Sequence, residues 1–232
     1  MEPIRLDKHL SALLGIPRGE ARRYIEGGWV SVNGEVVEQP QRPVDDSAVI
    51  VVAEQASDEK AERVSMLLNK PAGVAAETLC TLVSSDSRSE LDASDIRPLQ
   101  RHFHGLQLAA SLPAADSGLV VVSQDPATLA HLQRNLGRTE QEYLIEVAEG
   151  GPERGPWLMA RLQQEAGGGK VSWQSEQRLR FAGKGLTAKG LRAAVTTAGL
   201  QVTGVRRLRI GRVALGPLPP GQWRYLGSDE RF

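Results

Sequence analysis

The sequence predicts an α+β protein in two parts, a small N-terminal module and a larger domain behind it. Residues 5–52 contain two amphipathic helix patterns and one hairpin signal. A polar stretch without apolar periodicity follows at residues 53–63, and we interpret it as a linker. Behind it, short β-branched runs alternate with helix patterns, and the 24 glycines and 13 prolines of the chain indicate many turns.

The N-terminal module begins with a predicted helix pair. Over residues 5–15, leucines at helical spacing predict a helix that ends at Gly15, with an apolar face formed by Leu6, Leu10, Leu13 and Leu14. Pro17 suits the first turn of a second helix, which we expect over residues 18–26.

A small sheet and a basic surface complete the module. Two alternating runs around Asn33-Gly34 predict a β-hairpin, and residues 49–52 predict another strand. The predicted helices also carry basic side chains that suit contact with phosphate groups, namely Arg5, Lys8, Arg18, Arg22 and Arg23. The same charges also fit an ordinary solvated helix surface.

Residues 5–52 resemble the αL RNA-binding motif named after ribosomal protein S-four. The matching residues are Arg5-Leu6-Asp7-Lys8, Gly15-Ile16-Pro17-Arg18, Ala21, Ile25, Gly27, Val30 and Val32-Asn33-Gly34. Helix, turn and hairpin residues match together and without a gap. The resemblance implies a domain over residues 1–52 that binds RNA through its helical face.

The larger domain, residues 64–232, contains strand and helix patterns in alternation. A buried-strand pattern at residues 64–68 leads into the loop Asn69-Lys70-Pro71-Ala72-Gly73-Val74. Further strands are predicted at residues 119–122, 142–147, 170–173, 202–210 and 212–215, and helices at residues 128–136, 157–162 and 191–198.

This second domain resembles the pseudouridine synthases of the ribosomal small-subunit type, which carry the same αL module in front. The resemblance rests on the strand before Asn69-Lys70-Pro71-Ala72-Gly73-Val74 and on the ending Arg209-Ile210-Gly211 with Leu218-Pro219-Pro220-Gly221-Gln222-Trp223-Arg224. It implies an α+β catalytic-type domain with a central, mostly antiparallel sheet and an RNA cleft along it. It also implies that Tyr143 packs on the target base, with Gln141 where the family has lysine.

The stretch from Leu108 to Ser123 decides the functional prediction. From its residues alone it is a loop of small residues followed by a strand, with an Asp-Ser-Gly turn between them. The family motif here is Gly-Arg-Leu-Asp, two residues, Thr or Ser, one residue, Gly-Leu. Aligning Gly118-Leu119 with its end places Pro113 at the catalytic Asp, and proline has no ionisable group. Asp116 lies three residues late, at the Thr or Ser position.

A second family motif, Gly-Arg-x-Arg-Gln-Val-Arg, is also altered in the segment from Leu186 to Arg192. Lys189 and Arg192 keep their charge, whereas Thr187 and Gly190 replace an arginine and a glutamine. We therefore expect a relaxed active site on a retained fold, with no carboxylate in hydrogen-bond reach of the Tyr143 hydroxyl.

The last third of the chain is strongly basic although the net charge of the whole chain is zero. Between Gln177 and Ser228 there is no Asp or Glu, but there are ten cations: Arg178, Arg180, Lys184, Lys189, Arg192, Arg206, Arg207, Arg209, Arg212 and Arg224. Such segregation predicts a polyanion as partner, and we assign Lys70, Arg206, Arg207 and Arg209 to RNA binding. The alternative is that these cations pair with acids of the first half.

The functional prediction is an RNA-binding, catalytically impaired member of this family, acting on structured RNA and above all ribosomal RNA. The first alternative is an active synthase that isomerises uridine in ribosomal or transfer RNA, with Asp116 as the acid, Tyr143 stacked on the base, and Lys189 and Arg192 beside them. A further alternative is an assembly or protein-interaction role. Neither cofactor nor metal is implied. One cysteine and no apolar run of membrane length predict a cytoplasmic protein, and we expect a monomer.

Overall fold

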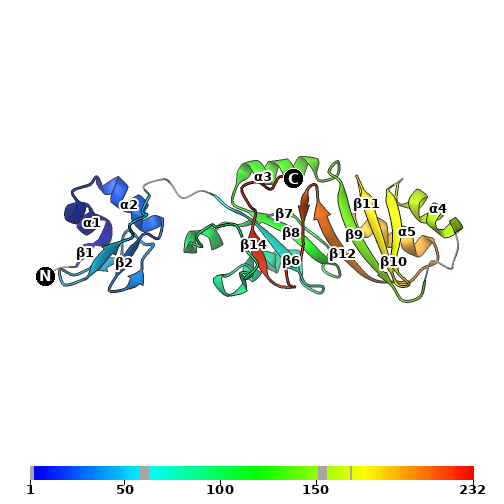
Figure 1. The fold of residues 1–232 in the computed structure, drawn as a ribbon, viewed down its shortest axis with the longest axis horizontal. Helices are drawn as coiled ribbons and strands as arrows, with labels where there is room; N and C mark the ends of the chain where they lie inside the picture. The colour runs from blue at the N-terminus through cyan, green and yellow to red at the C-terminus, as the bar shows by residue number, and fades with distance from the viewer. Residues whose placement is uncertain (1–2, 58–62, 151–155, 168) are drawn as a thin grey trace. The chain divides into compact units, whose positions relative to one another are not determined.

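A computed structural model describes residues 3–57, 63–150, 156–167 and 169–232. The chain divides into two compact units (Figure 1). The first consists of Met1–Arg63 and Arg97–His104, and the second of Val64–Ile96 and Gly105–Phe232. The predicted linker includes residues 58–62, which lie outside the described residues, as do residues 151–155 and 168 of the Gly- and Pro-rich stretch. The α+β class is confirmed.

The first unit packs two helices on a small sheet. Its elements are β1 (Ile4–Arg5), α1 (Leu6–Leu14), α2 (Arg18–Glu26), β2 (Val30–Val32), β3 (Glu35–Val36), β4 (Pro43–Val44), β5 (Ile50–Val52) and η3 (Gln100–Phe103). Leu6 and Leu10 are fully buried with Ala21 and Ile25, whereas Leu13 and Leu14 are 57% and 43% exposed. The predicted four-leucine face is therefore wrong in its second half, because the last turn of α1 extends beyond the core.

The second unit is built on a nine-stranded sheet in the order β10-β11-β9-β12-β8-β6-β14, with β7 on β8 and β13 on β12. Its strands are β6 (Ser65–Lys70), β7 (Gln107–Ala110), β8 (Ser117–Ser123), β9 (Gln141–Val147), β10 (Lys170–Ser175), β11 (Arg178–Gly183), β12 (Val202–Ile210), β13 (Val213–Ala214) and β14 (Trp223–Tyr225). Their pairing is antiparallel except between β8 and β12. The predicted mostly antiparallel sheet is thus confirmed.

The parallel contact between β8 and β12 is short and requires a glycine. Arg206 pairs with Ser117, and Arg207 pairs with Gly118. Gly118 has φ +104°, and a Cβ atom there would lie 2.3 Å from the carbonyl oxygen of Arg207. This position therefore needs glycine both for its backbone conformation and for the close approach of the neighbouring strand.

Helices pack against several strands of this sheet (Figure 1). Helix α3 (Pro126–Asn135) contacts β7 and β8, α4 (Pro156–Glu165) contacts β10, and α5 (Ala188–Thr197) contacts β12. Asp125 caps α3 by accepting hydrogen bonds from the N–H groups of Ala127 and Thr128. In the described ranges, no helix combines the length and hydropathy of a membrane span.

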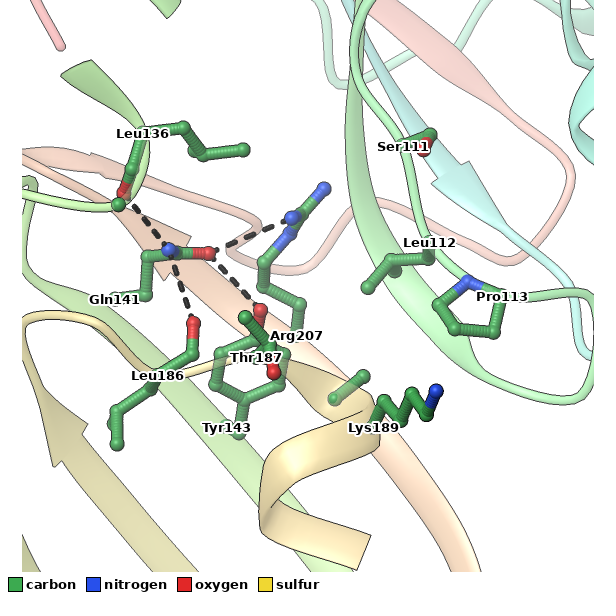
Figure 2. A pocket seen from close by; sticks show the side chains of 12 residues that line it. Ser111, Leu112, Pro113, Leu136, Gln141, Tyr143, Leu186, Thr187, Lys189 and Arg207 are labelled. Atoms are coloured by element: carbon green, nitrogen blue, oxygen red, sulfur yellow. Dashed lines mark hydrogen bonds between the residues drawn. The ribbon is translucent and has the colours of Figure 1, made fainter. Parts of the chain in front are cut away.

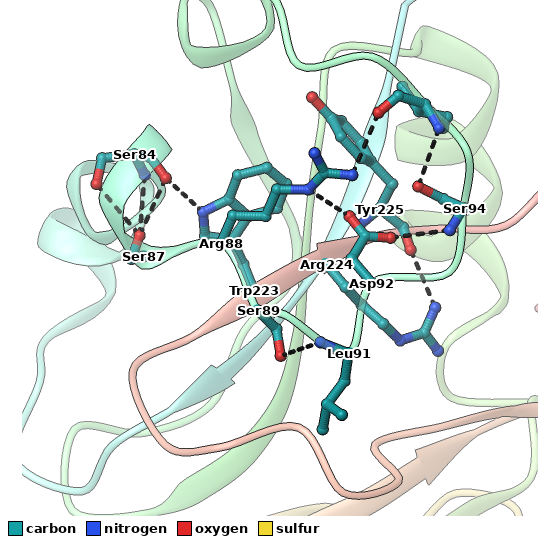
Figure 3. A network of polar contacts seen from close by, with 11 residues as sticks. Ser84, Ser87, Arg88, Ser89, Leu91, Asp92, Ser94, Trp223, Arg224 and Tyr225 are labelled. Atoms are coloured by element: carbon teal, nitrogen blue, oxygen red, sulfur yellow. Dashed lines mark hydrogen bonds and ion pairs between the residues drawn. The ribbon is translucent and has the colours of Figure 1, made fainter.

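The segment before β7 contains two 3₁₀ helices, η1 (Ala76–Leu82) and η2 (Ser85–Ser87), and a polar network that attaches it to β14 (Figure 3). The Trp223 indole donates a hydrogen bond to the Ser84 carbonyl at 2.7 Å. Arg88 forms an ion pair with Asp92 at 2.8 Å and lies over the Tyr225 ring. Tertiary contacts of this kind hold the segment in place. The local sequence pattern of residues 75–107 therefore does not predict its structure.

Candidate functional site

A cavity of about 190 Å³ lies where five parts of the second unit meet. Its walls come from the loop between β7 and β8, the end of α3, the strands β9 and β12, and the start of α5 (Figure 2). The lining residues are Ser111, Leu112, Pro113, Leu136, Gly137, Gln141, Tyr143, Leu186, Thr187, Ala188, Lys189 and Arg207. The stretch from Leu108 to Ser123 therefore contributes a wall of the cavity, although its first part is strand β7 rather than the predicted loop.

Pro113 lines this cavity, whereas Asp116 does not. Asp116 is buried, and its carboxylate forms an ion pair with Arg192 of α5 at 2.5 Å. The two residues are 76 positions apart in sequence, and the fold brings them together outside the lining of the cavity. Among the described residues, no Asp or Glu lines the cavity itself.

Lys70 holds the loop that contains Asp116. Its side chain is fully buried, and the ammonium group donates hydrogen bonds to the carbonyl oxygens of Pro71, Ala114 and Asp116 at 3.1, 2.9 and 2.7 Å. Burial lowers the pKa of Lys70, although the nearby Asp116 carboxylate acts in the opposite direction. This burial contradicts the assignment of Lys70 to RNA binding, because its charge faces the protein backbone.

Tyr143 lies in the cavity wall with its ring almost wholly buried. Its hydroxyl donates a hydrogen bond to the Gln141 side-chain oxygen at 2.9 Å, and in the described residues no bond to a carboxylate accompanies it. Burial raises the pKa of Tyr143. The charge of Arg207 acts against this increase, and the charge of Asp116 adds to it. Tyr143 is therefore a neutral hydrogen-bond donor and not a base at neutral pH.

Gln141 fixes the tyrosine, a role that sequence reasoning missed. Its side-chain N–H₂ group donates to the carbonyl oxygens of Leu136 and Leu186 at 3.0 and 3.2 Å. These two bonds orient the amide so that its oxygen faces the Tyr143 hydroxyl (Figure 2). One signal in the sequence could have indicated this role. Gln141 and Tyr143 are two positions apart at the start of a predicted strand, and residues at that spacing share one face of the sheet.

The other predicted basic residues of this domain have different environments. Lys189 lies at the cavity, and its backbone belongs to the first turn of α5. Arg207 lines the same cavity but is only 2% exposed, so its assignment to a surface RNA contact is wrong. Arg206 lines a different cavity, of about 260 Å³, because adjacent residues of β12 point to opposite sheet faces. Arg209 pairs with Glu140 and Glu142 at 2.5 and 3.3 Å.

The ten cations of the last third are partly neutralised. In the described part of the chain, carboxylate partners are present for Arg178, Arg180, Arg192, Arg209 and Arg224. Four of these five pair with acids located before residue 177, but only Asp116, the partner of Arg192, lies in the first half of the chain, so the alternative left open by the sequence holds for that pair alone. The basic surface predicted for the last third is therefore limited to the cations that have no carboxylate partner in the described part of the chain.

In the first unit, one carboxylate organises two of the predicted RNA-binding arginines. Asp7 is buried, and Arg5 and Arg18 both donate to it at about 3 Å. Both arginines remain about half exposed. Arg22 forms an ion pair with Glu26 one helical turn away, and Lys8 is exposed.

Comparisons with known proteins agree with this architecture. Residues 4–50 match the S4 domain. The chain is 27% identical to an uncharacterized RNA pseudouridine synthase of Aquifex aeolicus, covering 98% of this chain and 94% of the relative. It is 25% identical to the dual-specificity RNA pseudouridine synthase RluF of Escherichia coli, covering 98% of this chain and 77% of that protein. A crystal structure of a pseudouridylate synthase superposes with a TM-score of 0.57 at 20% identity, over 96% of both chains.

The fold and its cavity thus define a pseudouridine synthase fold with an S4 domain in front. Along almost its whole length the chain is similar to RNA pseudouridine synthases, at 25–27% identity to the two relatives named above. Its departure from the central motif of the resembled family, at Pro113, coincides with a wall of the cavity.

Proposed function

We propose that this protein binds structured RNA, with ribosomal RNA as its target, and does not isomerise uridine. The observation that carries the proposal is the position of Pro113 in the cavity wall, at the motif position of the catalytic Asp. An acid that attacks or protonates a bound nucleotide must lie within hydrogen-bond reach of it. Pro113 offers no such group, and Asp116 is buried and bound to Arg192.

RNA binding is supported by two independent features. The S4 domain presents Arg5 and Arg18 on a surface where Lys8 and Arg22 are also exposed. The relatives that match almost the whole chain are named as RNA pseudouridine synthases. Phosphate groups of RNA are the natural partners of such arginines, and the affinity falls as salt rises.

An active synthase is the second candidate, and one observation favours it. The Asp116 carboxylate pairs with Arg192 at 2.5 Å and lies near enough to Tyr143 to raise the pKa of its hydroxyl. A rearrangement of the loop that held Asp116 in the cavity would bring a carboxylate, an arginine and a tyrosine together. Such a rearrangement requires breaking the ion pair and the Lys70 bonds, which disfavours it.

The deciding experiment measures pseudouridine formation in total RNA by mass spectrometry. We expect the natural chain and Asp116→Ala to form none above background, while both still bind RNA. Pro113→Asp restores a carboxylate at the cavity and is expected to gain activity, with Pro113→Asn as the neutral control of similar size. Robust activity of the natural chain that is abolished in Asp116→Ala would overturn the proposal.

A further inference from the structure

A further cavity, of about 340 Å³, lies on the surface of the first unit. It is formed by β1 and one side of α1, two elements that contact each other (Figure 1). The residues that line this α1 cavity are Ile4, Lys8, His9, Ala12 and Leu13. Lys8 and Ala12 are four positions apart, as are His9 and Leu13, so the cavity follows two neighbouring rows of side chains on the helix.

The wall of the α1 cavity is largely apolar. Three of its five lining residues are Ile4, Ala12 and Leu13, and Leu13 is 57% exposed although Leu6 and Leu10 of the same helix are fully buried. A single exposed leucine is ordinary on a protein surface, but this one lines a concavity as large as many ligand pockets. Contact with an apolar ligand surface would remove Leu13 from water, which is favourable.

The polar lining residues indicate the charge of such a ligand. Among the described residues no Asp or Glu lines the α1 cavity, and none forms an ion pair with the exposed Lys8. Arg5 follows Ile4 in β1 and is held by Asp7 at 3.0 Å. The cavity thus has an apolar wall with positive charge beside it, and it suits a ligand that carries a negative charge next to an apolar surface.

A nucleotide of single-stranded RNA has both of these properties. Its base stacks on flat side chains, histidine among them, while the phosphate beside it accepts hydrogen bonds from lysine or arginine. His9 is half-buried and supplies such a ring at the α1 cavity. A base inside a double helix is already paired and stacked, and it can enter a cavity only by leaving the stack. An unpaired nucleotide therefore fits the α1 cavity better than a duplex does.

We propose that the α1 cavity binds the base of an unpaired RNA nucleotide, with His9 and Leu13 against the base and Lys8 on the phosphate beside it. This inference rests on the proposed function, because it requires that the S4 domain binds RNA. It adds a preference to that function: the S4 domain selects loops and bulges over continuous double helices. The arginines held by Asp7 then contact the flanking backbone.

The test measures the affinity of the full chain for two fluorescent RNAs, a hairpin with an open loop and a blunt duplex, by fluorescence anisotropy. Leu13→Ser is expected to weaken binding of the hairpin at least about fivefold and to leave the duplex affinity unchanged. Leu14→Ser is the matched control, because Leu14 is 43% exposed in the same helical turn but does not line the cavity. Both side chains are exposed, so both variants are expected to fold.

Two variants of His9 test the stacking separately. His9→Ala should weaken binding of the hairpin at least about fivefold, the effect of losing one base that stacks on a ring. His9→Phe keeps a flat ring and should bind the hairpin as tightly as the natural chain. Equal losses in His9→Ala and His9→Phe would overturn the stacking role of His9.

A hairpin whose loop consists of abasic nucleotides keeps the phosphates but has no unpaired base. The natural chain should bind it at least about fivefold more weakly than the normal hairpin, and the loss caused by Leu13→Ser should disappear on it, because the two changes remove the same contact. An equal loss from Leu13→Ser on the normal hairpin, the abasic hairpin and the duplex would overturn the proposal.

Failure of this inference and failure of the proposed function have different signatures. A natural chain that binds neither RNA would overturn the RNA-binding function itself. A natural chain that binds the hairpin, with Leu13→Ser and Leu14→Ser equally tight, would overturn only the base site. In that case the α1 cavity would suit an apolar side chain of a protein partner instead of a nucleotide.

Discussion

At the scale of single residues, Asp7 shows how one buried carboxylate shapes a binding surface. Burial alone would raise its pKa, but hydrogen bonds from Arg5 and Arg18 outweigh that effect and lower the pKa from 3.8 to about 2. The two arginines lie on different elements, and Arg18 is 11 positions after Asp7 in the sequence. Asp7 therefore sets the spacing of two cations that we expect to contact RNA phosphates.

We predict that Asp7→Asn weakens RNA binding several-fold and lowers the free energy of unfolding by about 1–2 kcal/mol. The reason is that the substitution removes the negative charge and one of the two acceptor oxygens that hold both arginines, which then occupy more conformations. RNA titration and urea unfolding measure the two effects. Asp46→Asn, an exposed aspartate of the same unit, is the control and should change neither. Equal RNA affinity of Asp7→Asn and the natural chain would contradict the assigned role.

The depressed pKa of Asp7 also predicts a pH dependence. A carboxylate whose pKa is lower in the folded than in the unfolded state stabilises the fold above its unfolded pKa. This contribution is lost as pH falls from about 4 through about 2. Urea unfolding in that window should show a steeper loss of stability for the natural chain than for Asp7→Asn. Parallel curves would mean that the carboxylate is not held by the arginines.

At the scale of elements, Lys70 joins β6 to the loop before β8. We predict that Lys70→Met lowers the free energy of unfolding by about 2–4 kcal/mol, because three carbonyl oxygens, one of them buried, lose their donor. Lys170→Met on the edge strand β10 is the matched control, since Lys170 is exposed. Urea unfolding followed by tryptophan fluorescence measures the difference. A loss as small as that of the control would show that backbone turns alone hold the loop.

Local patterns were sufficient where an element is determined by its own residues. The bounds of α2 and β12 agree with those predicted, because helix signals surround one and β-branched residues dominate the other. Strand β7 was missed because its Gln-Leu-Ala-Ala sequence has little β-propensity and is fixed by pairing with β8. The ion pair of Asp116 with Arg192 could not be predicted, since it depends on how the loop and α5 pack.

At the scale of the whole molecule, charge is balanced through pairing across the sheet. Arg178, Arg180 and Arg209 of β11 and β12 pair with glutamates on or beside β9, which leaves fewer cations for RNA. Those without a carboxylate partner in the described residues are Lys184, Lys189, Arg206, Arg212 and the buried Arg207. RNA binding by the last third should therefore depend less on salt than its composition indicates.

We predict that Arg206→Ala and Arg212→Ala each reduce the slope of log affinity against log salt by about 1. Arg178→Ala should leave this slope unchanged, because Arg178 is paired with Glu146. Filter binding of a structured RNA over a range of salt concentrations gives the slopes. A larger effect of Arg178→Ala than of Arg206→Ala would show that RNA replaces the glutamate as partner of the paired arginines.

The two-residue contact between β8 and β12 joins two halves of the sheet that carry opposite walls of the cavity. Pro113 belongs to the half with β7 and β8, whereas Tyr143 and Lys189 belong to the half with β9 and α5. Gly118 and Arg207 form the short contact that links these two halves. We predict that a ligand touching both walls of the cavity slows amide hydrogen exchange at this contact, which would reveal occupancy of the cavity even where no reaction takes place.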